Sequence, residues 1–378
     1  MQQTIHLENA LAEIHLFDAG TGVKEYHVMI HVDAPTLTFA LQLQAVENAY
    51  RQLLSEQLKG CVAAFKRYFV SDATNQIELI RESEPGDAAW AVIQQPPLDG
   101  TKLALWVYLL TGVERRFTES GLEEISHGGY RHLWLCGANS QQQGSHAETT
   151  EILNSYVERL RQEGLTLERN CIRTWFFVND VDNHYAGMVR ARNEVFDEQQ
   201  LTADTHFIAS TGIGGRQADP AREVMMDAYA IDGIRREQVH YLYAASHLNR
   251  TSEYGVRFER GTYVDYGFRR KIFISGTASI NNKGEIMYRG DIRRQTARML
   301  ENVETLLSEA GASFEDVEVM VVYLRDMADY TVVKQIYDER FPDKPRVFVN
   351  APVCRPGWLI EMECIAIKKS QNNGFRDF

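Results

Sequence analysis

Long apolar runs and basic segments are both scarce in this chain of 378 residues. No stretch approaches the roughly 20 consecutive apolar residues that a membrane-spanning helix requires, and the first residues lack a basic and apolar leader. The formal net charge of -12 has no compensating basic stretch, which argues against nucleic acid or an anionic membrane surface as the main partner. We therefore expect a soluble, cytoplasmic protein.

Patterns that hold disulfides, metals or dinucleotides are missing as well. The cysteines are odd in number, scattered and without Cys-x-x-Cys spacing, which argues against a disulfide framework and against a zinc site. They are Cys61, Cys136, Cys171, Cys354 and Cys364. His240 and His247 lack metal-ligand spacing, and the glycine-rich residues 210–215 lack the spacing of a dinucleotide-binding fingerprint. We therefore expect no metal ion and no organic cofactor.

A repeated order of elements is the main feature that the sequence does contain. With 44% hydrophobic and 24% charged residues, the chain is long enough for two or three domains. Three times, an apolar strand is followed by a helix, a strand, a second helix and a closing pair of strands. We expect an α+β protein of three units at residues 1–120, 128–245 and 250–370, with the second helix absent from the first unit. The alternative is three generic α+β units whose alignment is forced.

Two carboxylates interrupt the apolar closing strand of the third unit. Because side chains alternate along a strand, Glu361 and Glu363 share one face, about 7 Å apart. Burial and a neighbouring carboxylate both raise the pKa of a carboxyl group, which suits a general acid near neutral pH. We therefore place the chemistry at Glu361. The alternative is an edge strand with solvent-exposed acids.

Aligning the three closing strand pairs separates the third unit from the other two. In the first unit, Leu105 falls opposite Glu361 and Trp90 falls opposite Arg346. In the second unit, Met225 falls opposite Glu361. Only the third unit therefore combines an arginine with an acid, and we expect one active site per chain.

Several short motifs give the third unit a specific resemblance. They are Ser275-Gly276 after an apolar strand, Glu301-Asn302, Tyr323 to Asp326, Tyr337, Phe341-Pro342, Pro345-Arg346 and Glu361 to Ala366. In these motifs the chain resembles the RidA/YjgF superfamily, closely over residues 257–369 and more loosely over the middle unit. The resemblance implies a sheet backed by two helices, and trimers with ligand pockets between subunits. Three copies in one chain then imply a monomeric, intramolecular pseudo-trimer.

Chain length and a cysteine near the acid narrow the resemblance. Glu361 follows Cys354 by seven residues, after the run from Pro352 to Arg355. In this the chain resembles the chorismatases, multi-repeat RidA relatives that cleave chorismate, a small anionic substrate. The resemblance implies that Glu361 protonates the methylene of the enolpyruvyl ether, so that pyruvate leaves and a cyclohexadiene diol or hydroxybenzoate remains. With a cysteine at Cys354, the chain resembles the branch of the chorismatases that forms 3-hydroxybenzoate.

Four further residues are candidates for substrate binding. Tyr254 and Arg257 lie in a segment similar to the family's Tyr-Gly-Pro and Phe-x-Arg stretch, although Val256 stands where proline is expected. Arg346 stands fifteen residues before Glu361, as the family's carboxylate-binding arginine does before its acid. Arg216, after the glycine-rich loop, could hold a second carboxylate.

Each candidate also has a structural alternative. Arg346 could form a salt bridge with Glu361 itself, and the loop before Arg216 could be a flexible hairpin connection. Cys354 could be a buried structural thiol, which is the commoner fate of cysteine. Tyr254 and Arg257 are residue types that are common in such loops.

Three functions are therefore compared. The first is chorismatase-like release of pyruvate from chorismate or a related enolpyruvyl ether. The second is an imine deaminase of the RidA type, against which Phe258 stands where the deaminases carry tyrosine. The third is a non-catalytic protein that binds a small molecule.

Overall fold

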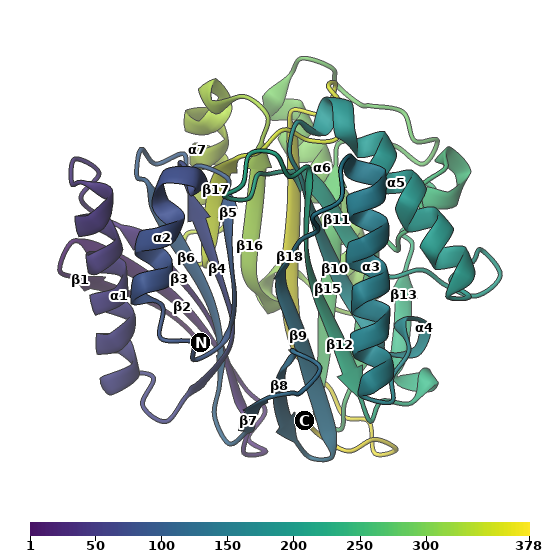
Figure 1. The fold of residues 1–378 in the computed structure, drawn as a ribbon, viewed down its shortest axis with the longest axis horizontal. Coiled ribbons are helices and arrows are strands. Elements are labelled where there is room, and N and C mark those ends of the chain that lie inside the picture. Colours follow the sequence, from purple (N-terminus) through teal and green to yellow (C-terminus); the bar gives the residue numbers. More distant parts are fainter.

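The computed structural model describes residues 1–378, apart from the side chain of Tyr254. It contains three six-stranded sheets, which face one another while the long helices lie on the outside (Figure 1). The predicted α+β fold of three RidA-like repeats, with sheets inside and helices outside, is therefore confirmed.

The first sheet is built from residues 2–110. Its strands are β1 (Gln2–Leu7), β2 (Ala10–Asp18), β3 (Lys24–Val32), β4 (Val62–Val70), β5 (Ala89–Gln94) and β6 (Leu103–Leu110). Its helices are α1 (Phe39–Ser55) and α2 (Ala73–Ser83).

The second sheet is built from residues 114–232. Its strands are β7 (Glu114–Phe117), β8 (Glu123–His127), β9 (Tyr130–Ala138), β10 (Cys171–Val178), β11 (Ala209–Gly214) and β12 (Val224–Asp232). Its helices are α3 (Ser145–Gln162), α4 (Leu167–Asn170) and α5 (Val181–Glu198).

The third sheet is built from residues 239–369. Its strands are β13 (Val239–Leu242), β14 (Gly261–Asp265), β15 (Arg269–Ala278), β16 (Val317–Leu324), β17 (Arg346–Asn350) and β18 (Ile360–Lys369). Its long helices are α6 (Ile292–Glu309) and α7 (Tyr330–Arg340). Short 3-10 helices are η1 (Arg236–Gln238), η2 (Thr251–Tyr254), η3 (Phe314–Asp316) and η4 (Met327–Asp329).

The strands follow one spatial order in all three sheets. That order is β1-β2-β3-β6-β4-β5 in the first, β7-β8-β9-β12-β10-β11 in the second and β13-β14-β15-β18-β16-β17 in the third. Each sheet also has a register shift at the same point, between its fourth and sixth strands in chain order. Because order and irregularity coincide, residues can be matched between sheets by counting from this shift.

The first unit differs from the expectation in one element. Helix α2 follows β4, so the prediction that the first unit lacks its second helix is wrong. Ile77 and Ile80 lie on its buried face, but this apolar stripe is short and a polar stretch follows it, so the sequence pattern does not reveal the helix. The connections between the sheets run through residues 111–113 and 233–238.

Helix α6 shows how the sequence specifies a local element. Its N-cap is Asp291, whose side chain accepts a hydrogen bond of 3.0 Å from the backbone N–H of Arg294. Leu300, Val303 and Leu307 form a buried stripe, as their spacing predicts. The helix thereby covers the third sheet next to β15 and β18.

Aromatic rings and ion pairs fill the centre between the sheets. The ring centroids of Trp134 and Tyr229 are 4.3 Å apart, and those of Phe65 and Trp134 are 5.2 Å apart. Arg67 of β4 donates to Asp227 of β12 with an Nη2–Oδ2 distance of 2.7 Å, and both side chains are buried. Separating such a buried ion pair would leave an unpaired charge in the interior, which strongly destabilises the folded state. It therefore fixes the first sheet against the second.

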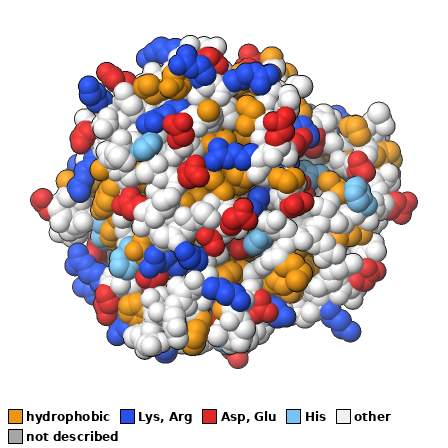
Figure 2. Space-filling view, turned by 180° about the vertical axis from the view of Figure 1, so that it is seen from behind, with side chains coloured by type: hydrophobic (Ala, Val, Ile, Leu, Met, Phe, Trp, Pro, Cys, Tyr) orange, Lys and Arg blue, Asp and Glu red, His pale blue; other side chains and the backbone are white. Residues whose placement is uncertain are grey.

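The face of the molecule seen in Figure 2 mixes acidic and basic side chains with small hydrophobic patches. The described side chains form no continuous basic surface on this face. Among the described residues, no helix is both long and apolar enough to cross a membrane.

Candidate active site

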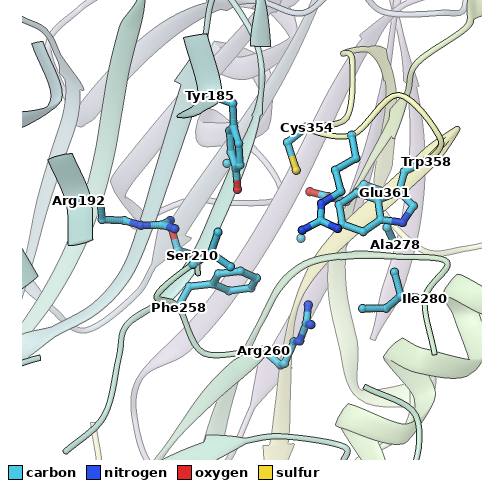
Figure 3. A pocket seen from close by; sticks show the side chains of 14 residues that line it. Tyr185, Arg192, Ser210, Phe258, Arg260, Ala278, Ile280, Cys354, Trp358 and Glu361 are labelled. Atoms are coloured by element: carbon cyan, nitrogen blue, oxygen red, sulfur yellow. The ribbon is translucent and has the colours of Figure 1, made fainter. Parts of the chain in front are cut away.

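A narrow cavity of about 40 Å³ lies between the second and third sheets. The second unit supplies residues of helix α5 and strand β11, and the third supplies residues of β15, β18 and three loops (Figure 3). The lining residues are Tyr185, Arg192, Ser210, Gly212, Val256, Phe258, Arg260, Gly276, Ala278, Ile280, Cys354, Arg355, Trp358 and Glu361. The site thus belongs to an interface between repeats.

Glu361 is the acid of this cavity. Burial raises the pKa of its carboxyl group to about 8, and the charge of Glu363 adds to this rise, while Arg260 and Arg173 oppose it. The sequence-based expectation of a raised pKa is confirmed. At pH 7 most molecules therefore carry a protonated Glu361, which can donate a proton.

Gly276 of β15 is shaped to the carboxyl group of Glu361. A β-carbon at this position would collide with Glu361 Oε1. The backbone N–H of Gly276 also donates to Thr211 Oγ1 of the second sheet, at 2.9 Å. Glycine is therefore required for β15 to approach both residues this closely.

Glu363 lies in a different environment from Glu361. Its carboxylate accepts hydrogen bonds from Arg173 Nη2 at 2.7 Å, from Trp175 Nε1 at 2.8 Å and from the hydroxyl of Thr211. Arg67 Nη1 lies 3.8 Å from the same carboxylate. These groups come from the first and second sheets, so Glu363 is held between repeats by charge-assisted hydrogen bonds. Glu361 faces the cavity instead, and the two acids of β18 thus lie in different environments.

Cys354 faces the same cavity from the loop between β17 and β18. Burial raises the pKa of its thiol to about 12, the charge of Glu361 contributes, and a hydrogen bond with Tyr185 opposes the rise. In Figure 3 the sulfur atom and the Tyr185 hydroxyl both point toward the middle of the cavity. The thiol is therefore protonated at neutral pH, so that it can act as a polar wall or a weak donor but not as a thiolate.

Three guanidinium groups complete the lining. Arg192 of α5 and Arg260 are buried, and Arg355 is partly buried. Arg260 donates to the carbonyl and side-chain oxygens of Asn249 at 3.1 Å, and its guanidinium carbon lies 5.4 Å from the Phe258 ring centroid. With Glu361 neutral, these side chains make the lining strongly positive, which suits a ligand with more than one carboxylate.

Arg346 does not share this cavity, so the predicted pairing with Glu361 is corrected. Its guanidinium donates to the carbonyl oxygens of Phe341 at 2.6 Å and Lys344 at 3.0 Å, and to Asp338 Oδ1 at 2.6 Å. It lines a separate cavity between the third and first sheets. The alternative, a salt bridge from Arg346 to Glu361, is also wrong, because its acidic partner is Asp338.

The repeated strand registers explain this placement. Three cross-strand pairs lie at the same distance from the register shift of their own sheet, so they correspond to one another. They are Arg346 with Met320, Ser210 with Thr174, and Trp90 with Lys66. Ser210 of β11 therefore occupies, beside Glu361, the position that Arg346 occupies in the next interface. The Glu361 cavity combines the edge strand β11 of the second sheet with β15 and β18 of the third. Arg346 lies on β17, the edge strand of the third sheet, and therefore faces the next cavity, between the third and first sheets.

The same registers test the alignment of the acid. Glu361 pairs with Tyr323, and the matching pairs are Met225 with Phe177 and Ala104 with Phe69. The match with Met225 is confirmed, whereas Leu105 in the first unit is wrong by one residue. The connection between β5 and β6 is one residue shorter than that between β17 and β18. Counting on from Trp90 by the fifteen residues that separate Arg346 from Glu361 therefore reaches Leu105 instead of Ala104.

The other sequence-predicted residues lie elsewhere or are not described. Arg216 donates to Gln94 Oε1 at 2.8 Å, in a contact of the second unit with the first, and is not among the residues that line the cavity of Glu361. Arg257 donates to the carbonyl oxygen of Asn193 at 2.9 Å and pairs with Asp197, which ties its loop to α5. The side chain of Tyr254 lies outside the described residues.

Comparisons with known proteins agree with this architecture. The family model described as Endoribonuclease L-PSP matches residues 258–368. A RutC family protein of Pyrococcus abyssi is 41% identical over 100 residues, which are 26% of this chain and 79% of the relative. The 3-aminoacrylate deaminase RutC of Acinetobacter baylyi is 34% identical over 97 residues, 25% of this chain and 77% of the relative.

A solved structure extends the likeness beyond the third unit. The crystal structure of a chorismatase superposes with a TM-score of 0.63, covering 81% of this chain and 93% of that one. The sequence identity over this superposition is 18%, so the likeness concerns the fold.

Proposed function

Because the chain belongs to the RidA/YjgF superfamily, we propose that the cavity of Glu361 cleaves the enolpyruvyl ether of chorismate or a close relative and releases pyruvate. The observation that carries this proposal is a neutral, buried carboxylic acid surrounded by three arginines and a thiol. The chorismatase fold supports it. A dicarboxylate with an acid-labile enol ether is the substrate class that needs all of these groups.

The arginines would bind the two carboxylates of the substrate. Arg192 and Arg260 point into the cavity from opposite units (Figure 3), and Arg355 lines it from the loop of Cys354. Guanidinium groups bind carboxylates in a bidentate manner, and a buried site strengthens such pairs. The ether is thereby held with its methylene carbon next to Glu361.

Protonation by Glu361 starts the reaction. The carboxyl proton is transferred to the methylene carbon of the enolpyruvyl group, which leaves an oxocarbenium ion and the Glu361 carboxylate. Water adds to the cationic carbon and returns a proton to Glu361. The hemiketal then collapses to pyruvate and a cyclohexadiene diol, so that one water is consumed. In the 3-hydroxybenzoate branch the ring also loses one hydroxyl group and one ring proton as water, which makes it aromatic, so that no water is consumed overall.

Glu363 and Cys354 would have supporting roles. The fixed negative charge of Glu363 keeps Glu361 protonated until substrate binds. Cys354, as a neutral thiol, would take up room beside the ring and influence which oxygen captures the cation. Its raised pKa argues against a covalent thioether or thioester step through a thiolate.

Substrate entry requires a side chain to move, because a six-membered ring exceeds the present cavity of about 40 Å³. Phe258 and Arg260 line this cavity and also a neighbouring one formed by residues 202–207 and 249–252. A rotation of Phe258 would join the two spaces. We therefore regard Phe258 as the gate of the site.

A second candidate is deamination of an enamine or imine of the RidA type, with Glu361 activating water. The identity of the third unit to 3-aminoacrylate deaminase favours it. An argument against deamination is that the position of the carboxylate-binding arginine, Arg346 in the next interface, is taken by Ser210 in the Glu361 cavity.

The deciding experiment compares two substrates under the same conditions. Purified protein is mixed with chorismate, pyruvate is followed by coupling to lactate dehydrogenase, and the ring product is identified by chromatography. In parallel, ammonia release from 2-iminopropionate is measured. Pyruvate from chorismate supports the proposal. Ammonia from 2-iminopropionate at a rate above its spontaneous hydrolysis, with no pyruvate from chorismate, supports the deaminase. Binding of chorismate without either activity leaves a non-catalytic ligand-binding protein.

A further inference from the structure

A second, larger cavity lies at a different interface, between the first and second sheets. Its volume is about 580 Å³, and it is lined by residues of β5, β8 and β9 and of helix α3. Strands β5 and β9 correspond in the repeat to β11 and β15, which line the cavity of Glu361. Gly137 of β9 matches Gly276 by register, but Met225 stands where the acid would be. The site therefore keeps the shape of a ligand pocket without its general acid.

Aromatic side chains give this cavity a flat, apolar lining. Trp90, Phe117 and Trp134 belong to it, together with Leu135 and Ile152. Phe117 is 70% exposed, so its ring is accessible to a ligand in this cavity. The indole N–H of Trp134 is buried and has no hydrogen-bond partner among the described residues. A buried donor of this kind favours a ligand that brings an acceptor.

The charges of the cavity favour an anion. Arg115 Nε lies 2.6 Å from Glu123 Oε1, and Arg115 Nη2 donates to Glu123 Oε2 at 3.0 Å. The two side chains therefore neutralise each other. Arg159 of α3 donates through Nη1 to the carbonyl oxygens of Ser120 at 2.7 Å and Gly121 at 3.2 Å. Its other guanidinium nitrogens have no hydrogen bond to the described residues. One positive charge is thus available at the cavity.

We propose that this cavity is a second, non-catalytic binding site for a monocyclic aromatic carboxylate. The ring lies against Trp90 and Leu135, and the carboxylate accepts hydrogen bonds from Arg159 and from the indole of Trp134. Met225 stands in place of the acid that lines the other cavity, and Glu123, whose pKa is raised by burial, is held by Arg115. This proposal does not rest on the reaction proposed for Glu361.

The test uses benzoate as the probe and benzamide as its neutral counterpart, with binding to the full chain measured by saturation-transfer NMR. Benzoate binds saturably and benzamide does not. In Arg159→Gln, affinity for benzoate falls about tenfold, the loss expected of one charge-assisted hydrogen bond. Arg161→Gln is the matched control, because Arg161 lies on the same helix and pairs only with the exposed Glu158 among the described residues. Equal affinity in Arg159→Gln and Arg161→Gln overturns the proposal.

A second pair of variants keeps the test valid if Arg159→Gln unfolds the chain. Ser155 is exposed and lines the cavity one turn before Arg159. Ser155→Glu places a negative charge beside Arg159 and weakens benzoate binding, whereas Ser155→Gln does not. Arg260→Gln, in the cavity of Glu361, leaves this binding unchanged. If Arg260→Gln removes it instead, benzoate occupies the Glu361 cavity and the second site is refuted.

Discussion

Glu361 and Glu363 lie on the same face of β18, yet Glu363 is hydrogen-bonded to the second sheet whereas Glu361 lines a cavity and has a raised pKa. Arg173 and Trp175 donate to Glu363 from the second sheet. Burial and the charge of Glu363 raise the pKa of Glu361 to about 8. Arg173 of the second sheet opposes this rise, so the burial of Glu361 between the repeats is the larger effect on its pKa.

Removing the proton donor should stop the reaction without harming the fold. Glu361→Gln keeps the shape of the side chain, and we expect pyruvate release from chorismate to fall by about 10² to 10⁴, the usual cost of losing a positioned general acid. The measurement is the initial rate of pyruvate formation at pH 7. The control is Glu301→Gln, on the exposed face of α6, which should keep the full rate. Full activity in Glu361→Gln would refute the mechanism.

The same substitution should change the pH dependence of stability. The pKa of Glu361 is higher in the folded chain than in the unfolded one, so the folded state binds the extra proton between about pH 4.5 and 8. Its contribution to stability is present below pH 4.5 and is lost as the pH rises through 8. Glu361→Gln removes this loss, and we expect the variant to gain stability relative to the wild type between pH 6 and 9. The measurement is chemical denaturation at both ends of this range.

Glu363 should control the alkaline limit of activity. A general acid works only while protonated, so pyruvate release should decline as the pH rises through about 8, the pKa of Glu361. In Glu363→Gln the repelling charge is gone and Arg173 is left without its carboxylate, and both changes lower the pKa of Glu361. We expect the alkaline limb of kcat/KM to move to lower pH. A lower rate with an unmoved limb would indicate a purely structural role.

The sequence predicted the fold better than the site because the two depend on different information. Alternation along β18 and the stripe of Leu300, Val303 and Leu307 on α6 are local patterns, and both predictions are confirmed. The match of Arg346 with Glu361 was also local, a spacing along one chain. It failed because the two strands face different neighbours, which only the arrangement of three sheets reveals.

The residues that α5 contributes were missed for the same reason. Tyr185 and Arg192 reach the cavity from the second unit, far in sequence from Glu361. One signal was available: Arg192 lies in the stripe of Met188, Ala191 and Val195, where a charge is unexpected on a buried helix face. A charge in an apolar stripe indicates a buried polar site, although it does not indicate which unit completes that site.

Cys354 should affect the product and not the rate of ether cleavage. The thiol lies beside Glu361 but is protonated, since burial raises its pKa to about 12. If it directs capture of the cation, Cys354→Ala still releases pyruvate but shifts the ring product from 3-hydroxybenzoate toward the diol. Cys364→Ala, at a buried thiol of the same strand as Glu361, is the control. An unchanged product mixture in Cys354→Ala would assign the thiol to packing.

The corrected position of Arg346 gives the last prediction, a contrast between two arginines. Arg346 bonds to the carbonyl oxygens of Phe341 and Lys344 and to Asp338, so it holds the end of α7 against β17. In Arg346→Gln these acceptors lose charged donors, and we expect a stability loss of about 1 to 3 kcal/mol. The KM for chorismate should stay unchanged, because the guanidinium lies in another interface.

Arg260→Gln should behave in the opposite way. Arg260 lines the cavity of Glu361, and its loss removes part of the positive charge that would hold the substrate. We expect the KM for chorismate to rise about tenfold or more, the cost of one charge-assisted contact. Because Arg260 also lowers the pKa of Glu361, the alkaline limb of activity should move to higher pH in this variant. A raised KM in Arg346→Gln with an unchanged KM in Arg260→Gln would restore the pairing that the spacing of Arg346 and Glu361 suggested.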